Sequence, residues 1–306
     1  MPRAPQPFVG RPFSGQPFSG QPFIGSEALA AGLVNRHQLR TGFTRLFPGV
    51  YQARQTTPSL QDRICAAWLW SQRRGVIAGL AAAALHGTRW VDSHSAVELV
   101  HANARAPAGV VVRRDLLLAG ETVRIGEMTV TTPARTAFDL GRVGQLNSAV
   151  ARVDALMNAT GLSATAVAEL AAAHPRARGL RRLEATLALT DGGAQSPRET
   201  WLRLLLVRAG LPAPRTQIPV SGPGGYPFAY LDLGWPESMV AVEYDGDHHR
   251  SDRRQYVRDI RRRERLERMG WIVVTVVAED RPDRIVERVR DALERRSTVR
   301  PGRSSA

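Results

Sequence analysis

Residues 228–249 read FAYLDLGWPESMVAVEYDGDHH and gather acidic residues and two histidines into one short stretch. Phe228–Gly234 and Met239–Asp245 both alternate in polarity, and a Gly-Trp-Pro-Glu-Ser turn separates them, which predicts a β-hairpin. Side chains of a strand point alternately to its two faces, so Glu243 and Asp245 share one face. We expect Asp232 to lie close to the level of Ala241 and Glu243 across the hairpin, at separations of roughly 5 to 8 Å.

Three clustered carboxylates repel one another unless a cation or a proton compensates their charge. Oxygen ligands at this spacing suit Mg²⁺ or Mn²⁺, and we therefore expect Asp232, Glu243 and Asp245 to be metal ligands. The alternative is that Asp232 and Asp245 flank turns and Glu243 is an exposed strand residue. Val240 and Val242 are the residues expected to face the core.

The same stretch resembles a known family. An acidic strand residue, then Glu243-Tyr244-Asp245-Gly246, then histidine, an arginine-rich helix and Gly270-Trp271 before a strand are similar to very-short-patch-repair-like endonuclease domains. These domains belong to the PD-(D/E)XK, restriction-endonuclease-like superfamily. The resemblance covers roughly residues 196–296 and implies a mixed sheet flanked by helices.

The resemblance also implies roles for individual residues. Asp232 corresponds to the first metal ligand, Glu243 and Asp245 to the acidic pair of the next strand, and His248 or His249 to an imidazole near the scissile phosphate. Neighbouring carboxylates favour proton transfer by such a histidine near neutral pH. Glu199 is a candidate for the metal shell, but Ser196-Pro197-Arg198-Glu199 is also a complete helix-capping signal.

One departure from the superfamily is the absence of lysine: all 42 basic residues other than histidine are arginine. The usual Glu-x-Lys is here Glu243-Tyr244-Asp245, so a histidine or a metal-bound hydroxide has to replace the lysine. A domain that keeps the fold without the chemistry remains open.

The net charge of +14 favours a polyanionic partner, and nucleic acid is the first candidate. Residues 250–268 are expected to form a helix with nine arginines and four acidic residues. Guanidinium groups suit phosphate oxygens, although surface ion pairs and a compositional bias are the alternative explanation. Tyr256, Ile260 and Leu266 are expected to mark its buried stripe, with Arg263 inside it. The expected nucleic-acid contacts of this helix are Arg250, Arg253, Arg254, Arg258, Arg261 and Arg262.

The N-terminal half contains a second resemblance. Residues 26–32 predict a short helix capped by Ser26, Asn35 predicts a second helix, and Phe43–Tyr51 predicts a strand-turn-strand wing. His37-Gln38-Leu39-Arg40 and Phe47-Pro48-Gly49-Val50-Tyr51 resemble the winged-helix domain of AbiEi antitoxins. That resemblance implies DNA contacts by Arg36 and Arg40, whereas the alternative is a helix pair that docks on the next domain.

The remaining chain is predicted in segments. Residues 6–25 are four tandem pentapeptides that predict a disordered tail at 1–25. The winged helix is expected at 26–55 and an α/β middle domain at 56–190. The middle domain is expected to contain helices at 60–72 and 76–85, strands at 96–101 and 109–113, a hairpin at 121–131, and helices over 133–189. The nuclease-like domain is expected at 191–297 and a second tail at 298–306.

The expected fold class is thus α/β (α+β) in two parts, a winged helix with an α/β middle region and a restriction-endonuclease-like mixed sheet. The expected function is Mg²⁺- or Mn²⁺-dependent hydrolysis of DNA, in repair or phage defence. A DNA-binding regulator or antitoxin is the alternative, and cleavage of RNA also stays open. One cysteine and no apolar run of membrane length favour a cytoplasmic protein without a membrane partner. A homodimer and a toxin partner remain open.

Overall fold

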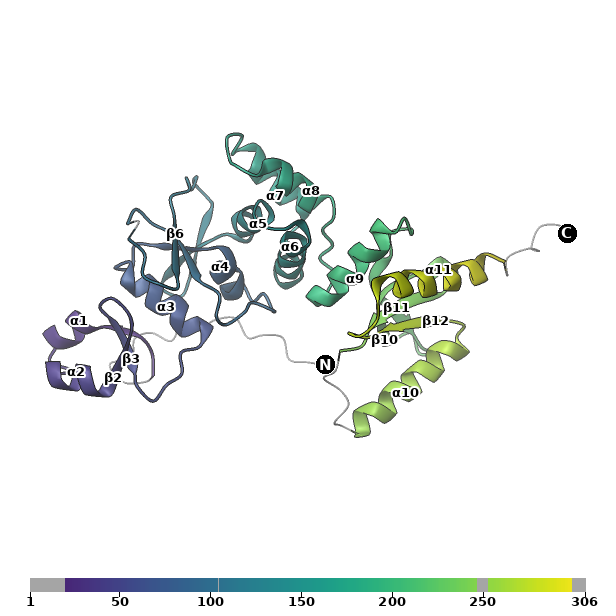
Figure 1. Ribbon diagram of the computed structural model, residues 1–306, viewed down its shortest axis with the longest axis horizontal. Helices are drawn as coiled ribbons and strands as arrows, with labels where there is room; N and C mark the ends of the chain where they lie inside the picture. Colours follow the sequence, from purple (N-terminus) through teal and green to yellow (C-terminus); the bar gives the residue numbers. More distant parts are fainter. Residues whose placement is uncertain (1–19, 104, 247–252, 299–306) are drawn as a thin grey trace. The chain divides into compact units, whose positions relative to one another are not determined.

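The computed structural model describes residues 20–103, 105–246 and 253–298, and it is mixed α/β. The chain divides into two compact units, Met1–Thr190 and Asp191–Ala306. Figure 1 shows the elements of each unit. No helix in the described ranges combines the length and the apolar character needed to cross a membrane.

The first unit begins with a small antiparallel sheet and two short helices. Its sheet order is β1-β3-β2. The elements are β1 (Phe23–Ile24), α1 (Gly25–Ala30), α2 (Arg36–Gly42), β2 (Phe43–Phe47) and β3 (Val50–Ala53).

Two predictions for this part are confirmed and two are wrong. Asn35 caps α2, since its side chain accepts a hydrogen bond from the Gln38 amide at 2.8 Å, and the strand-turn-strand predicted at residues 43–51 is present as β2 and β3. Ser26 lies inside α1 rather than capping it. The predicted tail is too long, because Phe23 and Ile24 are buried and pair with β3. Residues 1–19 lie outside the described ranges.

A five-stranded sheet of order β6-β5-β4-β8-β7 follows, with helices beside it. The elements are α3 (Leu60–Trp70), β4 (Val76–Ala78), α4 (Gly79–Leu85), β5 (Val97–Val100), β6 (Val110–Arg113), β7 (Thr122–Ile125), β8 (Met128–Thr131), α5 (Pro133–Gly141), α6 (Leu146–Thr160), α7 (Ala164–Ala172) and α8 (Leu180–Leu187). The prediction of helix from residue 76 is wrong, because residues 76–78 pair with β5 as a strand.

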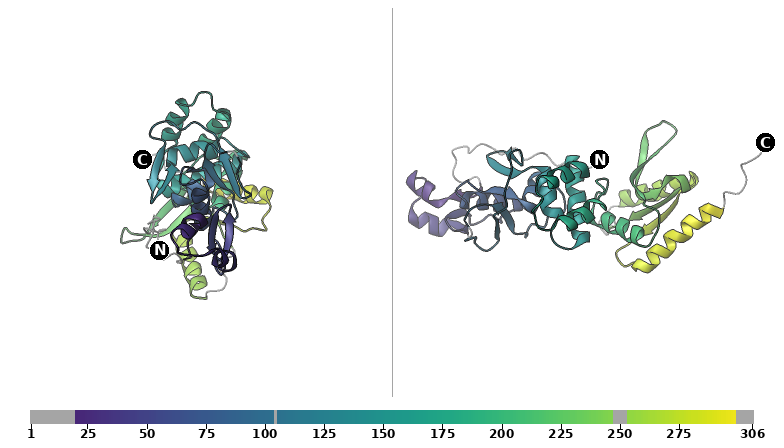
Figure 2. Two further views of the ribbon diagram at one scale, coloured as in Figure 1. Left: turned by 90° about the vertical axis from the view of Figure 1, so that its left-hand side faces the viewer. Right: turned by 90° about the horizontal axis from the view of Figure 1, so that it is seen from above.

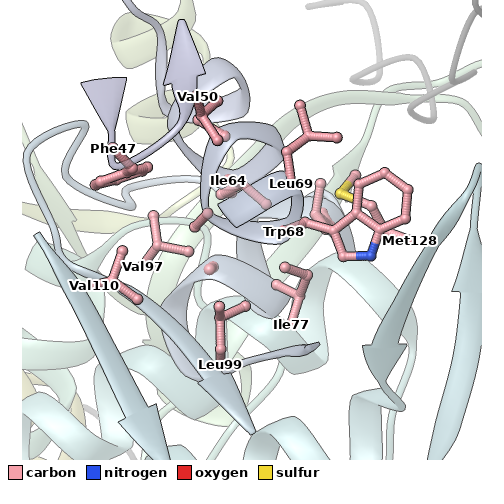
Figure 3. Packing of buried hydrophobic residues seen from close by; sticks show 14 of the residues in the cluster. Phe47, Val50, Ile64, Trp68, Leu69, Ile77, Val97, Leu99, Val110 and Met128 are labelled. Atoms are coloured by element: carbon pink, nitrogen blue, oxygen red, sulfur yellow. The ribbon is translucent and has the colours of Figure 1, made fainter. Parts of the chain in front are cut away.

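Besides a small cluster that contains Phe23 and Leu39, two larger hydrophobic clusters stabilise the first unit. One joins α3 to the sheets through Ile64, Trp68 and Leu99 (Figure 3). The other lies among α4 to α8 around Phe138. Arg135, 1% exposed, forms ion pairs with Glu121 and Asp139. Each of these charged groups has a partner, so the ion pairs offset the cost of burying the charges and hold the surrounding elements together.

The second unit is a four-stranded mixed sheet of order β12-β11-β10-β9, in which only the β11–β12 pair is parallel. Its elements are α9 (Pro197–Arg208), β9 (Arg215–Ser221), β10 (Pro227–Trp235), a 3₁₀ turn η1 (Pro236–Ser238), β11 (Val240–Tyr244), α10 (Arg253–Arg268), β12 (Ile272–Val276) and α11 (Pro282–Thr298). The predicted hairpin strands are therefore confirmed as β10 and β11.

Helices contact both faces of this sheet. Val240 and Val242 are fully buried as predicted, in one cluster with α9 and α11. Ala241, from the alternate position, packs with Leu266 of α10 in a second cluster. Gly270, at φ +91°, ends α10 in the left-handed conformation that glycine adopts without strain.

Candidate active site

Asp232 and Glu243 lie where β10 and β11 separate. The regular pairing of the two strands runs from Trp235↔Val240 to Leu233↔Val242. Beyond it, the Tyr244 amide donates a hydrogen bond to Oδ2 of Asp232 at 3.1 Å. The carboxylate thus accepts a hydrogen bond from the neighbouring strand where the backbone pairing stops, and Glu243 follows on the next position of β11.

Glu199 reaches the same place from the first turn of α9. The Ser196 hydroxyl accepts a hydrogen bond from the Glu199 amide, which caps the helix as predicted. The Glu199 carboxylate in turn accepts hydrogen bonds from the Gln195 amide at 2.8 Å and the Gln217 side chain at 3.2 Å. Glu199 is 8% exposed, and burial raises its pKa above the usual range.

Asp232 is the most perturbed carboxyl group of this unit for which a pKa is resolved. Burial and, next, the negative charge of Glu199 raise its pKa to about 7. Glu243 acts in the same direction, while the Tyr244 amide and Arg262 oppose it. Glu199, Asp232 and Glu243 therefore form one electrostatic cluster, and a perturbed carboxyl group of this kind is typical of functional sites.

Arg262 of α10 compensates part of this charge. Its guanidinium forms a two-pronged ion pair with Glu243, and Nη1 donates to Oε2 at 3.0 Å. Nη2 also donates to the backbone oxygen of Tyr230 at 2.9 Å. The Arg262 side chain is 30% exposed and that of Glu243 is 15% exposed. Predicted as a phosphate contact, Arg262 here binds a carboxylate of the site.

The other predicted residues are distributed as follows. Asp245 is exposed just beyond β11. Arg258 and Arg261 are exposed on α10, whereas Arg36 and Arg40 are exposed on α2 of the other unit. Arg253 and Arg254 belong to α10 by backbone. His248, His249 and Arg250 lie outside the described residues.

The predicted buried stripe of α10 is wrong in part. Leu266 is fully buried, but Ile260 and Arg263 are exposed. The face of α10 that packs on the sheet includes Arg262, whereas the prediction placed Arg263 on that face. A guanidinium is tolerated there because Glu243 and the Tyr230 carbonyl accept its hydrogen bonds.

The acidic residues of the candidate site meet some of the requirements for binding a divalent cation. Across residues 20–103, 105–246 and 253–298, no three Asp, Glu, His or Cys side chains are arranged to hold a metal ion. Magnesium, however, is commonly held by one or two carboxylates together with water and substrate phosphate. Asp232 and Glu243 supply such a pair. The pKa of Asp232 is raised mainly by burial and then by the negative charges of Glu199 and Glu243, and a cation would compensate these charges.

Sequence reasoning missed Gln217 and Gln195. Gln217 lies on β9 between Thr216 and Ile218, which pair with Leu233 and Leu231 of β10. It holds the left-handed φ of +48°, which is uncommon for a residue other than glycine. Its side chain contacts Glu199 and accepts a hydrogen bond from the Gln195 side chain at 2.9 Å. No sequence pattern predicts the contacts of Gln217 with Glu199 and Gln195, since they join residues that are far apart in the chain.

The chain is similar to two mycobacterial proteins. Both come from Mycobacterium tuberculosis, from strains CDC 1551 / Oshkosh and ATCC 25618 / H37Rv, and are named uncharacterized protein MT2308 and uncharacterized protein Rv2248. Each is 27% identical over 257 residues, which is 83% of this chain and 93% of the relative. No family model matches the chain, and no solved structure matches it.

Proposed function

We propose that the second unit is a divalent-cation-dependent endonuclease that hydrolyses phosphodiester bonds of DNA. The observation that carries this proposal is the half-buried Asp232, whose pKa of about 7 reflects burial and the nearby Glu199 and Glu243. The sheet with helices on both faces supports a restriction-endonuclease-like fold for this unit. The pair α1 and α2 with the β2–β3 wing supports a winged helix in the first unit.

In this proposal the residues of the chain have distinct tasks. Asp232 and Glu243 would hold Mg²⁺ or Mn²⁺, which supplies a water of lowered pKa and stabilises charge on the phosphate. Arg262 orients Glu243 through its two hydrogen bonds. Arg258 and Arg261, exposed on α10, are suited to bind the phosphate backbone. His248 or His249 is proposed to assist proton transfer.

Proton and cation compete for Asp232. A carboxyl group with a pKa of about 7 is largely protonated at pH 6 and largely ionised at pH 8. Cation affinity and cleavage should therefore rise across neutral pH.

The test is nicking of supercoiled plasmid DNA in Mg²⁺, with duplex DNA, single-stranded DNA and RNA as further substrates. We expect Asp232→Ala and Glu243→Ala to reduce nicking roughly 100-fold or more. Glu237→Ala is the matched control, because this exposed carboxylate of the same unit forms an ion pair with the exposed Arg215. Nicking that EDTA leaves intact, or that Asp232→Ala and Glu237→Ala affect equally, contradicts the proposal.

A second candidate is a DNA-binding regulator or antitoxin whose nuclease fold has no catalytic activity. The two-pronged Arg262–Glu243 ion pair favours it, because it already compensates one of the proposed metal ligands. The exposed Arg36 and Arg40 of α2 would then provide the DNA contacts. Sequence-specific duplex binding that Arg36→Ala abolishes, together with no Mg²⁺-dependent nicking, would establish this function in place of the first.

A further inference from the structure

Two exposed tyrosines lie on the β9–β10 hairpin, close to the candidate active site. Tyr226, in the turn between the strands, is 84% exposed, and Tyr230 of β10 is 55% exposed. Tyr230 alternates with the buried Ala229 and Leu231, so its ring points away from the core that they form with α10. Figure 2 shows the hairpin extending from the body of its unit.

The hairpin contacts α10 near its turn. The Arg265 guanidinium lies over the Phe228 ring, 3.8 Å from its centroid. Gly222 leaves room for that guanidinium, because a Cβ at this position would collide with it. Arg262 also donates a hydrogen bond to the Tyr230 carbonyl. The backbone that carries the tyrosines is thus fixed, while the two rings remain open to solvent.

The position of Tyr230 connects it to the proposed reaction. It precedes Asp232 by two residues on β10, which separates their Cα atoms by roughly 7 Å along the strand. A nucleotide next to a phosphate bound at Asp232 would lie within reach of the Tyr230 ring. Tyr226 lies in the turn of the same hairpin, four residues before Tyr230 and two residues before the Phe228–Arg265 stack.

We propose that this surface, Tyr226 with Tyr230, binds unpaired nucleotides of the substrate by stacking. The proposal rests on the nuclease function and narrows its substrate to DNA with a single-stranded or locally unpaired segment beside the scissile phosphate. An aromatic ring stacks on the face of any base, but in a regular duplex those faces are covered by neighbouring bases. The charge is complementary, since Arg258 and Arg261 of α10 are exposed and the chain carries +14.

The experiment is fluorescence anisotropy with a labelled single-stranded oligonucleotide and its duplex, in EDTA so that nothing is cleaved. We expect Tyr226→Ala and Tyr230→Ala each to weaken single-strand binding roughly 5- to 100-fold and to leave duplex binding within about 3-fold. Tyr226→Phe and Tyr230→Phe keep the ring and should bind like the unmodified chain. Leu116→Ala, at a 70% exposed residue of the first unit, is the control for loss of an exposed apolar side chain.

The outcomes separate this proposal from the nuclease proposal. Single-strand binding that depends on the tyrosine rings supports the stacking surface even where the plasmid assay shows no cleavage. Single-strand affinity that the alanine variants leave unchanged overturns it, even where nicking is confirmed. An equal loss on duplex and single strand, failure of the phenylalanine variants to bind, or no oligonucleotide binding by the unmodified chain also overturns it.

Discussion

At the scale of single residues, the protonation of Asp232 links the stability of the folded protein to pH. Its folded-state pKa of about 7 lies above the value of about 3.9 expected in the unfolded chain. Between these values the folded protein keeps a proton that the unfolded chain has lost, so stability decreases as pH rises through this window. Above about pH 7 the folded state contains an ionised carboxylate beside Glu199, which is a persistent cost in free energy.

Asp232→Asn should remove this cost and keep a hydrogen bond from the Tyr244 amide, since the side-chain amide oxygen is also an acceptor. At about pH 8 and without divalent cations, we expect the variant to exceed the unmodified chain in free energy of unfolding by about 1 to 4 kcal/mol. The difference should shrink toward zero near pH 4. Urea unfolding across this range measures it, and a difference that does not change with pH would refute the assignment.

At the scale of helices and strands, the site depends on the start of α9. Ser196 and Pro197 begin this helix, and the Ser196 hydroxyl both caps it and donates a hydrogen bond to the Glu199 carboxylate at 3.0 Å. Glu199 therefore belongs both to the capping signal and to the acidic cluster. The two interpretations of Glu199 that the sequence left open are compatible, because a helix cap is what brings this carboxylate into the cluster with Asp232.

Ser196→Ala should lower the stability of the second unit by about 1 kcal/mol, the usual cost of losing a serine cap. It should also lower Mg²⁺-dependent nicking, since Glu199 loses one of its hydrogen-bond donors. Ser163→Ala is the matched control: Ser163 caps α7 of the first unit through the Ala166 amide at 3.2 Å. It should cost a similar amount in unfolding and leave nicking unchanged. Equal nicking by both variants would contradict this role of Ser196.

At the scale of the whole molecule, each unit has a core of its own. The clusters around Trp68 and Phe138 belong to the first unit, and those around Val240 and Leu266 to the second. Glu199, Asp232, Glu243 and Arg262 all lie in the second unit. The candidate active site is therefore complete within one unit as far as the described residues show.

A fragment of residues 191–306 should accordingly fold without the first unit and keep the same nicking activity within about 3-fold, because it contains its own core and all site residues. Its urea unfolding should be a single cooperative transition. The fragment of residues 1–190 serves as the control and should show no nicking. A fragment 191–306 that is unfolded, or folded but inactive while the full chain nicks DNA, would show that the site needs the first unit.

Much of the secondary structure could be predicted because it depends on local signals. Asn35 and Ser196 predict the starts of two helices. The alternation of residues 239–245 predicts a strand whose Val240 and Val242 side chains face the core. The prediction of helix for Val76–Ala78 is wrong because three consecutive apolar residues are too few to show either a helical or a strand periodicity. Their strand conformation comes from pairing with β5 and β8, which are distant in the chain.

Sequence alone specified which acids belong to the hairpin and how strongly basic the chain is, since alternation and charge are properties of neighbouring residues. The three-dimensional fold decided that Arg262 and not Arg263 faces the sheet, and that Gln217 supports Glu199. It also set the pKa of Asp232, which depends on burial and on charges from α9, β11 and α10. The contacts of Arg262 and Gln217 and the surroundings of Asp232 arise only when separate elements pack against one another. No pattern within a single segment of the sequence encodes them.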